Sequence, residues 1–297
     1  MPFDSLGLAP ALVQAAAESG YAVPTAIQAA AIPAILQGRD VRGSAQTGSG
    51  KTAAFSLPLL QRLAAEPAQA PRRVRALVLV PTRELAAQVG EALRSLAQHL
   101  PERLKIAIAF GGVSINPQMM SLRGGADIVV ATPGRLLDLV EHNALKLGAV
   151  SMLVLDEADR LFDLGFAEEL GRILALLPAR RQNLLFSATF PPAIQALADG
   201  MLRDPAVIDV QGEPGTEPAI VQRVIEVDAN RRTQLLRHLL KENGWDRVLV
   251  FVATQHAAQT VAEKLYKNGV YAVPFHGDIA QGTRTGILAQ FKESRWD

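Results

Sequence analysis

A glycine-rich turn ending in Lys-Thr carries the clearest chemistry in the sequence. It reads AQTGSGKT and joins a short apolar run to a helical pattern. The glycines let the backbone curl so that successive N–H groups point at an anion, and the lysine adds a mobile positive charge. A helix that starts here adds its N-terminal N–H groups and dipole at the same place. The pattern predicts a phosphate-binding loop made of Ala45, Gln46, Thr47, Gly48, Ser49, Gly50, Lys51 and Thr52.

Two features of this stretch suit a plainer interpretation, a glycine turn before a helix. The general pattern has glycine where this chain has Ala45, and Arg42 interrupts the apolar approach, where a buried strand would have an aliphatic residue. The acidic sequence found about a hundred residues downstream favours phosphate binding instead.

That acidic sequence, DEAD, directly follows the apolar run 152–155. Asp156 comes at the expected end of a strand, where it and the Thr52 hydroxyl could hold Mg²⁺ beside the phosphate loop. Glu157 could orient or deprotonate a water molecule that attacks a phosphate. Taken alone, such carboxylates would more often cap the next helix and fill its first turn.

Apolar runs alternate with amphipathic stretches over the first two thirds of the chain. This alternation predicts an α/β fold, a parallel sheet with helices on both faces. Ligands of such sheets bind beyond the carboxyl ends of the strands. The phosphate loop, DEAD and the sequences PTREL, TPGR and SAT all fall at such ends, so we expect one site there. The predicted strands are residues 76–80, 106–110, 128–131, 152–155, 183–186 and 207–210.

Length and composition limit the class of protein. A chain of 297 residues suggests about two domains, each large enough to bury a core. There is no cysteine, which excludes disulfides and thiolate metal sites and suits a reducing cytoplasm. We also expect no signal peptide and no membrane span. The formal net charge of +1 does not indicate a polyanion partner, so local basic groups and backbone amides would have to hold one.

A Gly, Pro and Glu-rich stretch, QGEPGTEPA, interrupts the alternation and predicts a domain boundary. We expect a first domain at residues 1–211, a linker at 212–219 and a second, shorter domain at 220–297. Beyond the linker, strands are predicted at residues 221–227, 247–252 and 270–274, and helices at 232–242, 256–267 and 281–292.

Taken together, these motifs resemble the DEAD-box family of ATP-dependent RNA helicases. The resemblance covers essentially the whole chain, and its N-terminal block, FDSLGL with GY and PTAIQ, is most similar to bacterial RhlE-type helicases. It implies a RecA-like domain with a P-loop NTPase site and the N-terminal part of an incomplete second RecA-like domain. It also implies ATP and Mg²⁺ as the bound groups, and RNA held by its backbone.

The N-terminal block resembles the family's adenine-binding Q motif. The resemblance implies that Gln28 pairs with adenine, that Phe3 stacks on the ring, and that Tyr21 and Thr25 belong to the same site. Without the family, Gln28 would be a surface polar residue and Phe3 a core anchor.

Three further loops resemble the family's RNA-contacting motifs in the first domain. Loops shaped by Pro and Gly expose N–H groups, Thr caps a helix that faces a phosphate, and Arg supplies charge, a grip that is blind to base sequence. Taken singly, Thr82 would be an ordinary N-cap and Gly134 an ordinary turn residue. The implied RNA contacts are Pro81, Thr82, Arg83, Gly111, Gly112, Thr132, Pro133, Gly134 and Arg135.

SAT resembles the motif that links ATP hydrolysis to unwinding, and the hydroxyls of Ser187 and Thr189 could hydrogen-bond to Asp159. In the second domain, Thr254, Gln281 and Arg284 match RNA-contacting positions of the family. His276 would otherwise be a turn histidine.

Family members continue beyond Asp297 into another strand and an arginine-rich motif with an arginine finger. We therefore expect an RNA-dependent ATPase and helicase whose 297 residues alone bind ATP, bind RNA weakly and turn over slowly. The alternatives are a non-catalytic ATP- and RNA-binding clamp or fragment, and a DNA-directed translocase, because phosphate contacts do not distinguish RNA from DNA.

Overall fold

The computed structural model describes residues 2–67, 70–210, 220–245 and 247–293. The chain divides into two compact units, residues 1–217 and 218–297. The predicted linker at 212–219 lies entirely outside the described residues, so the predicted domain bounds stay a prediction. Each unit is described by itself.

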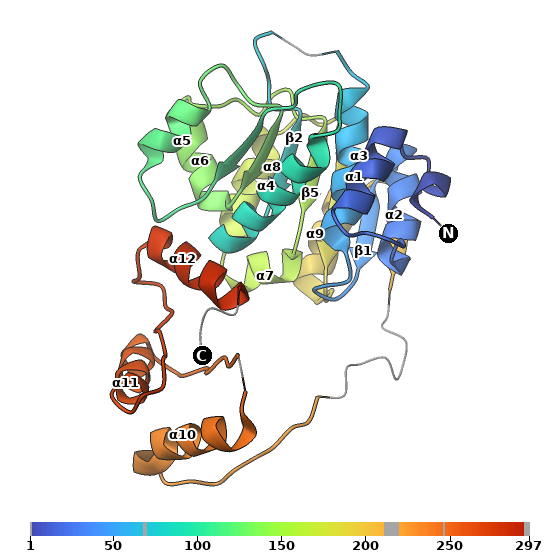
Figure 1. Ribbon diagram of the computed structural model, residues 1–297. Helices are drawn as coiled ribbons and strands as arrows, with labels where there is room; N and C mark the ends of the chain where they lie inside the picture. Colours follow the sequence, from blue (N-terminus) through green and yellow to red (C-terminus); the bar gives the residue numbers. More distant parts are fainter. Residues whose placement is uncertain (1, 68–69, 211–219, 246, 294–297) are drawn as a thin grey trace. The chain divides into compact units, whose positions relative to one another are not determined.

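The first unit is a parallel sheet with helices on both faces (Figure 1). The seven strands are β1 (Val41–Ser44), β2 (Ala76–Leu79), β3 (Ile106–Ala109), β4 (Ile128–Ala131), β5 (Met152–Leu155), β6 (Gln182–Ser187) and β7 (Ala206–Asp209). They lie in the order β3-β4-β2-β5-β6-β1-β7, and every pairing is parallel. The predicted fold class and the predicted strands of this unit are therefore confirmed.

Alternate residues of the strands feed two hydrophobic cores, one on each face of the sheet. Val78 and Val154 belong to one core, while Leu79 and Leu155 belong to the other. One face is covered by α1 (Pro10–Glu18), α2 (Ala26–Leu36), α3 (Lys51–Ala64) and α4 (Arg83–Ala97), preceded by the 3-10 helix η1 (Phe3–Leu6). The other is covered by α5 (Ile115–Ser121), α6 (Pro133–Glu141), α7 (Ala158–Asp163), α8 (Ala167–Leu176) and α9 (Pro192–Met201).

Arg42 fits into β1 because an aromatic ring covers its charge. The guanidinium carbon lies 4.3 Å from the centroid of the Phe190 ring, a cation–π contact. The side chain is only half-buried. An aliphatic residue is thus not required at this position of the strand.

The second unit contains the 3-10 helix η2 (Ala229–Arg231) and three helices, α10 (Arg232–Asn243), α11 (Gln255–Tyr266) and α12 (Gln281–Lys292). All three helices begin within one residue of their predicted starts. The three predicted strands are wrong: residues 221–227, 247–252 and 270–274 form no strand among the described residues. Strands need neighbours for their backbone hydrogen bonds, and these segments are poorly covered, with Val224 fully exposed and Phe251 91% exposed.

Candidate functional site

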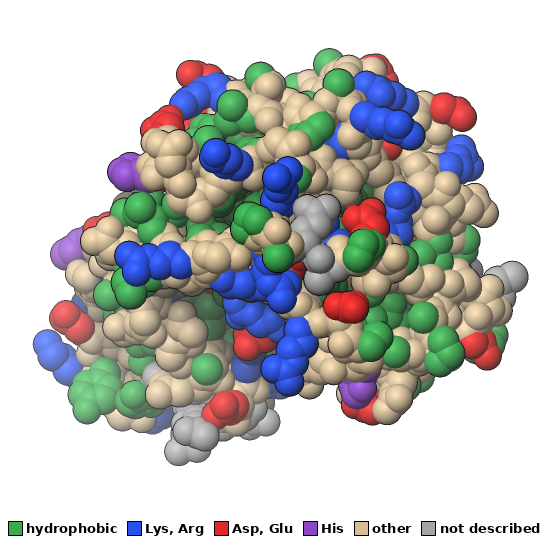
Figure 2. All heavy atoms as spheres, turned by 90° about the horizontal axis from the view of Figure 1, so that it is seen from above, with side chains coloured by type: hydrophobic (Ala, Val, Ile, Leu, Met, Phe, Trp, Pro, Cys, Tyr) green, Lys and Arg blue, Asp and Glu red, His purple; other side chains and the backbone are tan. Residues whose placement is uncertain are grey.

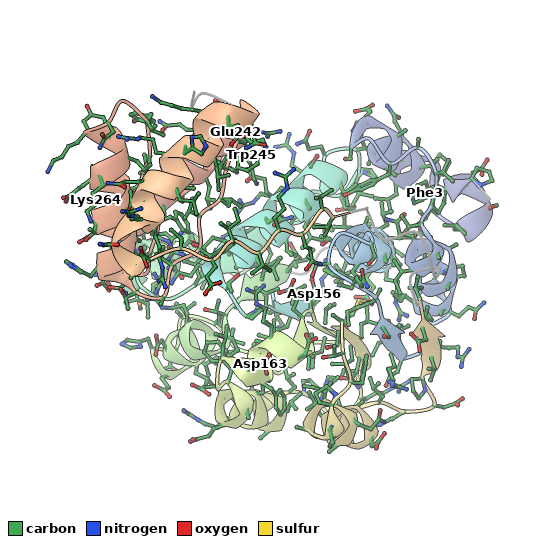
Figure 3. The ribbon with its side chains drawn as sticks, turned by 90° about the horizontal axis from the view of Figure 1, so that it is seen from below. Phe3, Asp156, Asp163, Glu242, Trp245 and Lys264 are labelled. Carbon is green, nitrogen blue, oxygen red and sulfur yellow. The ribbon has the colours of Figure 1, made fainter. Side chains whose placement is uncertain are left out.

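The strand order places the predicted motifs side by side along the carboxyl edge of the sheet. The loops after β5, β6 and β1 lie next to one another, as Leu155 pairs with Leu185 and Ser44 with Ser187. On the other half of the edge, Leu79 pairs with Ala131, so the loops after β2, β4 and β3 are also neighbours. Figure 3 looks onto this edge, with Asp156 near its centre. One edge therefore carries two adjoining groups of motifs.

The phosphate loop has the backbone shape that its glycines predict. Gly48 and Gly50 have φ values of 84° and 93°, and α3 starts directly at Lys51. The Lys51 ammonium is buried and donates a hydrogen bond to the Ala45 carbonyl at 2.8 Å. The Ser49 hydroxyl is buried without a hydrogen-bond partner. An unpaired buried hydroxyl beside a helix N-terminus suits an anionic ligand that would satisfy it.

Asp156 lies at the end of β5, 2% exposed. Burial raises its pKa to about 6, and the nearby Lys51 ammonium opposes that shift. A carboxylate held in such a place gains from an added cation, because the cation would offset the cost of burying its charge.

Glu157 occupies a backbone conformation that L-residues avoid. Its φ and ψ are both 52°, in the left-handed region, at the N-cap of α7. This conformation costs a non-glycine residue about 1–2 kcal/mol. Its side chain is 13% exposed and lies 3.6 Å from the Arg160 guanidinium. Strain of this kind, at a carboxylate that follows the buried Asp156 at the carboxyl edge of the sheet, is consistent with a role in chemistry.

The hydrogen bonds predicted between SAT and DEAD are present. Thr189 donates from its backbone N–H and from its hydroxyl to one Asp159 oxygen, at 2.9 Å each. The Ser187 hydroxyl accepts from the Asp159 N–H at 3.0 Å. Partial burial works to raise the pKa of Asp159, but the hydrogen bonds of Thr189 and Ser187 outweigh it and leave the pKa below its ordinary value. The carboxylate therefore stays ionised and ties the loop after β6 to α7.

Gln28 links its own helix to the phosphate loop. It is 1% exposed, accepts a hydrogen bond from the Thr25 N–H at 3.0 Å and donates to the Gly50 carbonyl at 3.1 Å. A Cβ on Gly50 would lie 2.4 Å from the Gln28 amide nitrogen, so only glycine fits there. The alternative of Gln28 as a surface residue is wrong. Its contact with Gly50 was not foreseen, and the only signal for it in the sequence is the glutamine itself.

The aromatic residues of the N-terminal block lie inward. Phe3 is 4% exposed and belongs to the core under η1, α1 and α2, while Tyr21 packs partly buried against the same core. In this arrangement Phe3 acts as a core anchor, and its ring is not open for stacking on a base. Figure 3 shows it well away from Asp156.

The loop after β2 leads into α4 through a capped N-terminus. The Thr82 hydroxyl accepts from the Leu85 N–H at 3.2 Å, as a helix cap does. Arg83 packs over Gly112 of the loop after β3, where a Cβ would lie 1.9 Å from the guanidinium. Gly111 and Gly134, in contrast, have nothing within 4 Å of an added Cβ. The backbone is therefore open to an approaching ligand at both of these glycines.

Arg135 differs from its expected placement as an open charge. It is 8% exposed, and its guanidinium donates to the Val113 carbonyl at 2.8 Å. Asp138 lies 3.4 Å from the same guanidinium. Arg135 thus joins the loops after β3 and β4, an interaction that a sequence motif does not reveal. Thr132 starts α6 without a capping hydrogen bond, and Pro133 fills the first turn.

The predicted contacts of the second unit lie at its helix starts. The Thr254 hydroxyl caps α11 by accepting from the Ala257 N–H at 3.1 Å. Gln281 is the first residue of α12, and the Arg284 guanidinium lies 5.0 Å from the centroid of the Phe275 ring. His276 contacts Gln259 at 3.3 Å.

A metal ion bound at the carboxyl edge would have few protein ligands. The described residues contain no group of three His, Cys, Asp or Glu side chains that could hold an ion. A buried carboxylate at Asp156, with the Thr52 hydroxyl on the first turn of α3, nevertheless fits a hard cation that takes its other ligands from water and phosphate.

A family model described as DEAD/DEAH box helicase matches residues 25–197, more than half of the chain. The chain belongs to this family. A second model, helicase conserved C-terminal domain, matches residues 231–297.

Several relatives of this DEAD-box chain have names. It is 42% identical to the ATP-dependent RNA helicase DeaD of Escherichia coli strain K12 over 295 residues. The matched residues are 99% of this chain and 46% of that protein. It is 40% identical over 291 residues to the DEAD-box ATP-dependent RNA helicase CshA of Bacillus cereus, covering 98% of this chain and 54% of that protein. The chain thus spans about half the length of these relatives.

A crystal structure of a DEAD box protein from the hyperthermophile Methanococcus jannaschii has the same fold. The TM-score is 0.66 at 36% identity, with 100% of this chain and 78% of that chain covered.

The two relatives from Escherichia coli and Bacillus cereus carry the names DeaD and CshA, so they do not support the finer expectation of an RhlE type. Among the described residues, no helix is long and apolar enough to cross a membrane.

Proposed function

We propose that this chain is the ATP- and RNA-binding part of an ATP-dependent RNA helicase that couples RNA-stimulated ATP hydrolysis to local duplex unwinding or remodelling of RNA–protein complexes. The observation that carries the proposal is the shared carboxyl edge, where a phosphate loop and a buried carboxylate adjoin loops with open backbone. The cytoplasm is the expected location.

Lys51 and the N–H groups of the loop would hold the β- and γ-phosphates of ATP. Thr52 and Asp156 would hold Mg²⁺, which neutralises phosphate charge during transfer. Glu157 would orient the attacking water and accept its proton. Asp159, Ser187 and Thr189 would carry the state of this site to the loop after β6, because their hydrogen bonds join the two loops.

RNA would be held on the other half of the edge. Arg83, Gly111 and Gly134 offer a positive charge and accessible backbone, which suits a sugar-phosphate chain and does not read bases. Arg135 would act by positioning the Val113 loop. Thr254, Gln281 and Arg284 would supply the contacts from the second unit.

Adenine selection is the first prediction. Gln28 uses one donor and one acceptor in its protein contacts, which leaves one amide hydrogen and one lone pair for N7 and N6 of adenine. We expect ATP to bind at least about tenfold more tightly than GTP, and Gln28→Ala to remove most of that preference. Competition of both nucleotides against fluorescent ATP measures it. Equal affinities in the unaltered chain would contradict the role of Gln28.

The choice of RNA over DNA is the second prediction. We expect single-stranded RNA to stimulate ATP hydrolysis at least about tenfold more than DNA of equal length and sequence, because only RNA has 2′-hydroxyls to bind. Steady-state ATPase assays with both strands test it. Equal stimulation would favour the DNA translocase instead.

Turnover by these 297 residues alone is proposed to be slow. An arginine finger contributes about 10³ to 10⁵ in rate in P-loop GTPases. The resemblance implies an arginine-rich motif of this kind in the family, and the chain spans about half the length of its named relatives. Comparing this chain with a version extended through that motif separates a slow enzyme from a non-catalytic clamp. Hydrolysis absent from both would favour the clamp.

A further inference from the structure

A cavity lies at the edge of the sheet opposite the candidate site, where the strands begin. Its volume is about 1110 Å³, and its walls come from the segments before β2 and β4 and from the loop after α6. The residues that would bind ATP and RNA follow the same strands at their other ends. None of the residues that line the cavity belongs to a motif predicted from the sequence.

The cavity is basic, although the whole chain is nearly neutral. Its lining includes Arg72, Arg73, Arg123 and Lys146, and among the residues that the structure describes it contains no Asp or Glu. The formal net charge of the chain is only +1. Figure 2 looks onto this edge and shows Lys and Arg side chains gathered in its central part. The concentration of positive charge is therefore local.

The carboxylate that follows the lining residue Ala126 in the sequence is already neutralised. Asp127, 1% exposed, accepts hydrogen bonds from Arg72 and from Arg75 and, at 2.8 Å, from the Lys105 N–H. It turns inward and does not line the cavity. By contrast, the exposed side chains of Arg73, Arg123 and Lys146 have no hydrogen bond or ion pair with the described part of the chain. Three charges are thus left for a ligand.

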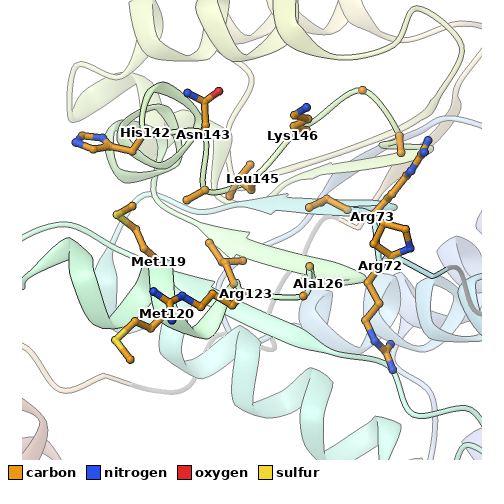
Figure 4. Close-up of a pocket in the computed structure, with 18 of the residues that line it drawn as sticks. Arg72, Arg73, Met119, Met120, Arg123, Ala126, His142, Asn143, Leu145 and Lys146 are labelled. Carbon is orange, nitrogen blue, oxygen red and sulfur yellow. The ribbon is translucent and has the colours of Figure 1, made fainter.

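The floor of the cavity is apolar, and two segments of its wall pack closely together. Met119, Leu122 and Leu145 line it, as does Met120, which is 61% exposed. Figure 4 shows the methionines and Arg123 on one side and Arg72 and Arg73 on the other. A Cβ on Gly125 would lie 2.1 Å from the Arg72 carbonyl oxygen, so these two segments pack backbone to backbone. A preformed wall lowers the cost of ordering on binding.

We propose that this cavity binds an acidic segment of a partner protein, with apolar side chains against the methionines and carboxylates on Arg73, Arg123 and Lys146. Nucleic acid fits less well, because the apolar floor offers a phosphate backbone no polar partner, and among the described lining residues no Phe, Tyr or Trp is present for a base to stack on. Exposed methionines are typical of surfaces that accept apolar side chains of varied shape. The occupant would be an amphipathic acidic peptide.

A fluorescein-labelled peptide of about twelve residues, in which Glu and Asp alternate with Leu, is the probe. We expect it to bind this chain with a dissociation constant of about 10 μM at low salt, weakening as salt screens the charges. Replacing its leucines with serine should weaken binding at least about tenfold, because the apolar floor loses its contacts.

The double variant Arg123→Glu with Lys146→Glu should bind the peptide at least about tenfold more weakly and bind ATP as the unaltered chain does. Arg39→Glu with Arg180→Glu is the matched control, since both arginines are exposed outside the cavity, and it should bind within about twofold of the unaltered chain. Thermal unfolding of each variant checks the fold.

Two results would overturn the proposal. One is peptide binding that both double variants weaken equally, because the interaction would then be non-specific attraction to the edge. The other is tighter binding of an oligouridylate of equal length than of the peptide, where the variant Arg123→Glu with Lys146→Glu no longer binds the oligouridylate. That outcome would make the cavity a nucleic-acid site, whatever the result of the ATP and RNA assays at the carboxyl edge.

Discussion

Replacing Lys51 with alanine is expected to weaken ATP binding by about 100-fold, or ~3 kcal/mol, the loss of a charge-assisted contact to phosphate. In the structure, the ammonium is 6% exposed and donates to the Ala45 carbonyl of the same loop. Phosphate oxygens would replace that carbonyl when ATP binds. The lysine thus carries a charge that no other residue of the loop can supply.

Equilibrium binding of fluorescent ATP measures this effect. Lys146→Ala removes the same charge at an exposed site near the start of β5 and should leave ATP binding unchanged. Because Lys51 is buried, Lys51→Met serves as a second variant that keeps an apolar stem in place. Retention of tight ATP binding by both Lys51 variants would contradict the assignment of the phosphate loop.

The fold of the first unit could be predicted because local patterns and tertiary packing agree there. The runs 128–131 and 152–155 are apolar at every position, and both form strands buried on both faces of the sheet, β4 and β5. The second unit could not be predicted in the same way. The run 247–252 has a strand composition, yet a strand exists only when a neighbour supplies hydrogen bonds. Helices α10 to α12 satisfy their own backbones and therefore form where expected.

The candidate site was predictable in its residues and less so in their contacts. The sequence places AQTGSGKT, DEAD and SAT at the ends of β1, β5 and β6. These strands are neighbours in the sheet, and this is why the predicted contact of Asp159 with Ser187 and Thr189 is present. The inward turn of Arg135 and the bond from Gln28 to Gly50 depend on carbonyls of other segments. Every residue has a backbone carbonyl, so no sequence pattern marks the one that is used.

Glu157→Gln is expected to slow ATP hydrolysis by about 10² to 10⁴ and to leave ATP binding within about twofold, because an amide cannot accept the proton of the attacking water. Glutamine keeps the size of the side chain and the strained backbone at φ 52°. The effect would therefore fall on the chemical step. This separates Glu157 from Lys51, whose loss would act on binding.

Single-turnover hydrolysis with protein in excess over labelled ATP, at saturating RNA, measures slow rates directly. Asp163→Asn is the matched control, since Asp163 is an exposed carboxylate at the end of the same helix, α7, and lies apart from Asp156 in Figure 3. It should hydrolyse ATP at the unaltered rate. If Glu157→Gln did the same, the water-activating group would have to be another residue, and the strain at Glu157 would need an explanation in folding alone.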